Sequence, residues 1–139
     1  MTRSLAIAAF FGWGAGACTS RVSQCDEVTT TIERHGRTAA RIDARAAEGG
    51  AGAVTDADAL AETAAALAAI QPTDPRLAEI AQQYAALLHE SAAVVRTAQG
   101  GAARRDRDAI DGAIAAFDAL SASEAQLVAE FNALCQAGD

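Results

Sequence analysis

Apolar residues recur at three- and four-residue steps along most of the chain, which is the period of an amphipathic helix. The first such stretch covers residues 20–47 and ends at a glycine-rich break, residues 48–52. Its arginines lie on the face opposite the apolar residues. We therefore expect a first helix with one buried face, formed by Val22, Cys25, Val28, Ile32, Ala39, Ile42 and Ala46.

A second helical stretch starts at Thr55, which has the spacing of a capping box with Asp58. It stops at the tetrapeptide Pro72-Thr73-Asp74-Pro75. The same tetrapeptide starts a third helix, with Asp74 as N-cap and Pro75 in the first turn. We expect the third helix to end at residues 100–101, both glycine. The expected core positions are Leu60, Ala64, Leu67 and Ala68 in the second helix and Leu77, Ile80, Tyr84, Leu87, Leu88, Ser91 and Val95 in the third.

The last segment covers residues 103–136. Ser121 and Glu124 have the spacing of a capping box, which would split the segment in two. The apolar stripe nevertheless continues past them without a change of phase, and no Gly or Pro lies at the junction. We therefore predict one long helix with its core face at Ile110, Ile114, Phe117, Leu120, Leu127, Val128, Phe131 and Leu134.

The composition supports an all-α fold. Ala accounts for 39 of the 139 residues, Pro for 2, and aromatic residues for 4%. Ala is the best helix former, and β-branched and aromatic residues are too sparse to build a sheet. Four segments with short connections predict a single domain, residues 22–137, folded as an antiparallel up-down-up-down four-helix bundle.

The N-terminal segment has the pattern of a secretory signal peptide. Arg3 is followed by an uncharged, partly apolar stretch, residues 4–17, which is shorter than the ~20 residues that a spanning helix needs. The stretch ends in Ala15-Gly16-Ala17-Cys18, which resembles the bacterial lipobox, although Leu is commoner than Ala at position 15. The resemblance implies cleavage after residue 17, acylation of Cys18 with chains such as palmitate, and a short tether, residues 18–21. Ordinary signal cleavage before Cys18 and a retained helix are the alternatives.

Acylation of Cys18 would leave two of the three cysteines for a disulfide, Cys25 and Cys135. With an even number of antiparallel helices, the start of the first and the end of the last lie at the same end of the bundle. A Cys25–Cys135 disulfide and a count of four helices therefore support each other. The alternative is two unrelated buried thiols.

The sequence contains few residues in patterns typical of catalysis, metal binding or ligand binding. Neither histidine has the Glu three residues earlier that a di-metal bundle uses. We interpret His35 as a partly buried structural residue and His89 as solvated. No nucleophile, phosphate-binding or Cys/His pattern is present, so we expect no enzymatic activity, no metal and no cofactor. The net charge of −7 also argues against nucleic acid as a partner.

One polar feature is arranged along a helix face, the arginine stripe Arg34, Arg37, Arg41 and Arg45. It is either a solvated face or a partner-facing surface. A second basic group, Arg104, Arg105 and Arg107, is interleaved with Asp106 and Asp108, which weakens any similar interpretation there.

The whole pattern resembles small uncharacterised bacterial lipoproteins, a resemblance that implies no activity. We expect a protein of the bacterial cell envelope, anchored by its N-terminal lipid and facing the periplasm or the surface. One hypothesis is a structural or protein-interaction module that contacts an envelope protein. The other is a periplasmic bundle that binds a small ligand between its helices. A core rich in Ala argues against the second hypothesis, whereas a cavity of a few hundred cubic ångströms would favour it.

Overall fold

The computed structural model describes residues 20–47 and 53–137, without the side chains of residues 35–36, 38–47 and 53–55. The described residues form four helices and no strand: α1 (Arg21–Ala47), α2 (Ala53–Ala69), α3 (Pro75–Arg104) and α4 (Arg107–Gln136). The all-α prediction is confirmed for this part of the chain. The last segment is one continuous helix through Ser121, as the unbroken apolar stripe predicts.

The start of α3 is capped by Asp74, as the sequence predicts. The carboxylate of Asp74 accepts hydrogen bonds from the backbone N–H groups of Arg76 (2.9 Å) and Leu77 (3.0 Å), which are unpaired within the helix. Pro75 occupies the first turn. The Thr55 capping box is wrong, because α2 begins at Ala53 and Thr55 already lies inside the helix.

The expected end of α3 at residues 100–101 is also wrong, because the helix continues to Arg104. Arg105 has the left-handed conformation (φ 56°) that ends it, and Asp106 caps α4 by accepting a hydrogen bond from the backbone N–H of Ala109 (3.1 Å). Gly101 serves the packing of the two helices. A Cβ at this position would lie 3.1 Å from the Cβ of Ala109, so glycine lets α3 and α4 approach closely.

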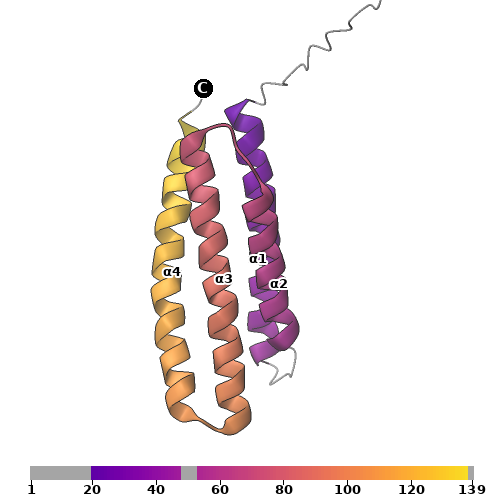
Figure 1. Ribbon diagram of the computed structural model, residues 1–139, viewed down its shortest axis with the longest axis vertical. Coiled ribbons are helices and arrows are strands. Elements are labelled where there is room, and N and C mark those ends of the chain that lie inside the picture. The colour runs from indigo at the N-terminus through magenta and orange to yellow at the C-terminus, as the bar shows by residue number, and fades with distance from the viewer. Residues whose placement is uncertain (1–19, 48–52, 138–139) are drawn as a thin grey trace, which may run out of the picture.

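The helices form an elongated molecule in which α4, α3 and α2 lie in a row and α1 lies behind α2 (Figure 1). α3 contacts both α2 and α4 extensively, α1 contacts mainly α2, and α1 and α4 contact each other only slightly. The turn between α3 and α4 reaches beyond the ends of α1 and α2 at the end of the molecule opposite the start of α1 and the end of α4 (Figure 1).

The main core cluster lies in the half of the molecule where α1 begins and α4 ends. Its fully buried large side chains are Val28, Leu67, Leu77, Ile80, Tyr84 and Leu88. The cluster is completed by Cys25, Leu87, Phe131 and three alanines, Ala64, Ala81 and Ala85, and partly buried residues of α4 pack against it. Polar residues inside the helices are satisfied locally: the hydroxyls of Thr31, Thr63 and Ser91 each donate to the carbonyl four residues earlier.

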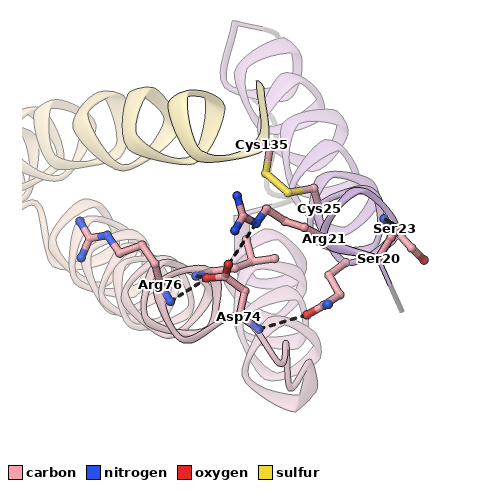
Figure 2. Close-up of a disulfide and its surroundings, with 9 residues drawn as sticks. Ser20, Arg21, Ser23, Cys25, Asp74, Arg76 and Cys135 are labelled. Atoms are coloured by element: carbon pink, nitrogen blue, oxygen red, sulfur yellow. Dashed lines mark hydrogen bonds and ion pairs between the residues drawn. A yellow bond between two sulfur atoms is a disulfide. The ribbon is translucent and has the colours of Figure 1, made fainter. Parts of the chain in front are cut away.

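The predicted pairing of Cys25 with Cys135 is confirmed. The two sulfur atoms lie 2.06 Å apart and the Cα atoms 6.0 Å apart. Figure 2 shows the disulfide joining the start of α1 to the end of α4. Because α1 and α4 contact each other only slightly, this bond is the main link between the first and last helices.

Candidate interaction surfaces

The apolar stripe of α4 is buried at one end only. Phe131 belongs to the core near the disulfide, whereas Ile114 is 56% and Phe117 47% exposed. The prediction that Ile114 and Phe117 are core residues is therefore wrong. The reason is that α4 packs on α3 and contacts α1 only slightly, so no described helix covers the remote half of its apolar face. Val22 is also 53% exposed rather than buried.

The uncovered face forms a groove between α3 and α4, with a volume of about 290 Å³. Most of its lining is apolar. The two polar exceptions are Gln99 on α3 and Asp118 on α4. The Nε2 atom of Gln99 is buried and has no hydrogen-bond partner among the described residues, whereas Asp118 is exposed. The lining consists of Val94, Val95, Ala98, Gln99, Ala113, Ile114, Phe117 and Asp118.

The groove continues the same helix face that forms the core. Residues separated by three, four or seven positions share a face of a helix. By this spacing, Phe117 lies on the same face of α4 as four residues that face the core: Glu124, Val128, Phe131 and Cys135. On α3, Val95 is likewise in phase with the buried residues Leu88 and Ser91. The groove is therefore an extension of the core surface rather than an isolated apolar patch.

A polar cluster near the disulfide fixes α1 to the connection between α2 and α3. The side-chain Oε1 of Gln24 accepts from the backbone N–H of Thr73 (2.6 Å), and its Nε2 donates to the Thr73 hydroxyl (3.0 Å). The Arg21 guanidinium lies 3.1 Å from the Asp74 carboxylate (Figure 2). The backbone N–H groups of Leu77 and Arg76, together with Arg21, lower the pKa of the Asp74 carboxyl. This arrangement is structural, since every group in it has a partner within the fold.

A second polar pair joins a core residue, Tyr84, to a partly buried residue, Glu124. The buried Tyr84 hydroxyl donates a hydrogen bond to the carboxylate of Glu124, across the α3–α4 interface. Burial and the neighbouring carboxylate both raise the pKa of Tyr84 above its ordinary value. Glu124 lies on the predicted core face of α4, and this hydrogen bond explains how a charged residue is accommodated there.

The structure brings few of the predicted site residues together. Cys25 and Cys135 are paired. Arg34 and Arg37 are exposed on α1, which fits both interpretations of the arginine stripe, and His89 is exposed as predicted. Cys18 and the side chains of His35, Arg41 and Arg45 lie outside the described residues.

Within residues 20–47 and 53–137, no helix is both long and apolar enough to cross a membrane. Nor do the His, Cys, Asp and Glu side chains of this part gather in a group of three or more that could hold a metal ion. No known protein family, curated protein or solved structure matches the chain.

Proposed function

We propose that the chain is a lipid-anchored protein of the bacterial envelope, in which an up-down-up-down helical bundle acts as a structural or protein-interaction module. The observation that carries this proposal is the Cys25–Cys135 pair. It accounts for two of the three cysteines and leaves Cys18, which follows Ala15-Gly16-Ala17 at the end of an uncharged segment. In an exported protein, acylation gives this remaining cysteine a chemical role.

The position of the groove supports an interaction role. The tether would join the bundle at the disulfide end, because only residues 18–21 separate Cys18 from the body of α1. The groove lies on the half of the α3–α4 hairpin remote from that end, away from the proposed membrane surface. Contiguous exposed apolar side chains mark contact surfaces, whereas singly exposed ones are common on any protein. A tethered module would present this surface to an envelope protein.

The test is the intact mass of the protein purified from its own cell envelope, measured under native and non-reducing conditions. We expect a chain that begins at Cys18, carries acyl chains and lacks two hydrogens because of the disulfide. A Cys18→Ala variant is the control, and it should lose the acyl mass and the membrane association while keeping the disulfide. An unacylated wild-type chain would remove the tether from the proposal.

The small-ligand hypothesis is the second candidate, and the groove is the observation that favours it. Its volume of about 290 Å³ lies just below the range of ligand pockets. However, such pockets bury most of their ligand, whereas Ile114 and Phe117 are about half exposed at the open side of this groove. We therefore rank the interaction module first. An additional small-molecule mass in the native spectrum, lost in a Phe117→Ser variant, would reverse that order.

A further inference from the structure

We propose that the groove between α3 and α4 is a closing site for α1. The second half of α1, residues 39–47, moves about the disulfide and covers the groove in a closed form of the same chain, whereas the structure shows the open form. Closure would control access to the contact surface proposed above, and only this consequence rests on the proposed function. The movement itself requires neither the lipid anchor nor a partner.

The first step concerns which helix is missing beside the groove. α2 is in place at this level, because the Arg96 guanidinium on α3 lies 2.8 Å from the Asp58 carboxylate on α2 and Leu60 of α2 is buried. α3 and α4 both line the groove. In a four-helix bundle each helix packs against two neighbours, but α1 contacts α4 only slightly. The open position is therefore that of one helix, between α4 and α2, and α1 is the helix that lies next to it.

The second step concerns the alignment of α1 with α4, which the disulfide fixes. Both helices extend from the disulfide toward the same end of the molecule (Figure 1), and each advances about 1.5 Å per residue. A residue at a given number of positions after Cys25 is therefore level with the residue at the same number of positions before Cys135. Ile32 and Val128 are level by this rule, one heptad from each cysteine, and both pack against the core cluster. The observed packing thus agrees with the alignment.

The same alignment places apolar positions of α1 opposite the groove. Ala46 lies three heptads after the first cysteine of the disulfide, and Ile114 lies three heptads before the second. One turn nearer the disulfide, Ile42 is level with Phe117 within one residue. Ile42 and Ala46 have heptad spacing from Ile32, so closure would extend an existing contact along the same helix face. Ile114 and Phe117 are the two exposed large side chains that it would cover.

One pair of like charges opposes closure. Asp43 directly follows Ile42, and Asp118 directly follows Phe117, so the two aspartates flank the same layer of the expected contact. In an antiparallel pair of helices these flanking positions lie on the same side of the seam, where two carboxylates repel each other. We therefore expect the closed form to be the less populated one, which fits the slight contact between α1 and α4 in the structure.

The experiment is disulfide trapping in the full chain with Cys18→Ala, in which oxidised glutathione exchanges with two new thiols. The test variant carries Ile42→Cys and Phe117→Cys. The matched control carries Ile42→Cys and Ala115→Cys, because Ala115 is exposed at almost the same level but lies on the opposite side of α4. We expect a bond within one chain in the test variant, formed at least about tenfold faster than in the control. Non-reducing peptide mapping identifies the joined cysteines and verifies that the native disulfide is intact.

A charge reversal tests the opposing aspartates. Asp118→Arg, added to the test variant, replaces the repulsion from Asp43 by attraction and should accelerate trapping about two- to fivefold. Asp111→Arg is the control, because it makes the same change on the same side of α4 but beyond the level at which α1 ends. It should have a smaller effect.

Far-UV circular dichroism and the melting temperature of each variant, measured before oxidation, establish that it is folded. If the test variant is not folded, the next layer, Ala46→Cys with Ile114→Cys, decides the question in its place.

Trapping that is equally fast in the test variant and the control, or absent from both, would overturn the inference. A bond between two chains without one inside a chain would also overturn it, and would assign the groove to a second copy. None of these results bears on acylation, which the intact mass measures separately. Closure and the proposed tether can therefore fail independently.

Discussion

The Cys25–Cys135 disulfide joins residues 110 positions apart, so removing it should change the unfolded state more than any other contact in the fold. The perturbation is the double substitution Cys25→Ala and Cys135→Ala, which leaves no unpaired thiol in the bundle. In the chain-entropy model, a loop of ~110 residues corresponds to about 16 cal/mol/K, or about 4.8 kcal/mol at 25 °C. This value is a large part of the 5–15 kcal/mol that stabilises a typical domain.

The hydrogen bonds between Gln24 and Thr73 and the ion pair between Arg21 and Asp74 hold the start of α1 near the α2–α3 connection without help from the disulfide, so we expect no additional loss from fraying of the folded state. Residual helical structure in the reduced, unfolded chain would shorten the effective loop and so reduce the expected loss. We therefore expect a loss of about 3–4 kcal/mol in the free energy of unfolding, which corresponds to a decrease of roughly 10–20 °C in the melting temperature.

The assay is urea unfolding followed by circular dichroism at 222 nm, which gives both the free energy of unfolding and the m-value. The m-value should rise in the double variant, because an uncross-linked unfolded chain exposes more surface. Wild-type protein with a reductant should behave like the double variant, and the reductant should leave the double variant unchanged. A loss below about 1 kcal/mol with an unchanged m-value would refute the reasoning, since the disulfide would then not restrict the unfolded chain.

Three further predictions concern single residues. Tyr84→Phe removes the hydrogen bond to Glu124 and should lower the free energy of unfolding by about 1–3 kcal/mol in urea at pH 7; equal stability would contradict a structural role for this pair. Because the folded-state pKa of Tyr84 is raised, the free energy of unfolding of the wild type should fall as the pH rises above about 10. The Tyr84→Phe variant should lack this pH-dependent loss of stability. Asp74→Asn keeps an N-cap but removes the charge, so it should destabilise the protein at pH 7. The pKa of Asp74 is lowered in the folded state, so its contribution is present above about pH 3.9 and is lost as the pH falls through the folded-state pKa. Thermal melts of the two proteins should therefore converge in acid, and a difference that persists there would point to the hydrogen bonds rather than the charge. Gly112→Ala should stabilise α4 by about 0.5–1 kcal/mol, because nothing lies within 4 Å of the new Cβ. Gly101→Ala should destabilise by about 1–3 kcal/mol, because its Cβ would lie 3.1 Å from that of Ala109 and 3.3 Å from the carbonyl oxygen of Asp106. Thermal melts that rank these two variants in the opposite order would show that helix propensity outweighs packing at the tip.

Features with a strong local cause could be predicted from the sequence. The Asp74-Pro75 start of α3 depends on side-chain and backbone chemistry within four residues. The continuity of α4 through Ser121 follows from an unbroken apolar period. Residues 100–101 misled the prediction, because glycine ends a helix only where the chain must turn. Here Gly101 is retained for close packing on α4, a tertiary reason that no local pattern contains.

The exposure of Ile114 and Phe117 had a different origin. Periodicity identifies the apolar face of a helix, but not whether another helix is there to cover it. Helix lengths do not supply this information either, because α1, with 27 residues, is nearly as long as α3 and α4, with 30 each, and yet contacts α4 only slightly.

The stabilising contacts and the exposed apolar groove lie in opposite halves of the molecule along its long axis. The disulfide, the Gln24–Thr73 hydrogen bonds and the Arg21–Asp74 ion pair all lie at the end of the molecule where α1 begins and α4 ends (Figure 2). The remote half of α4 is held mainly by α3 and exposes the apolar side chains of the groove. Substitutions at the first end should change the free energy of unfolding of the single chain. Phe117→Ser and Ile114→Ser remove side chains that are already about half exposed, so they should leave that free energy nearly unchanged. A large loss of stability in these two variants would instead show that the groove belongs to the core of the single chain.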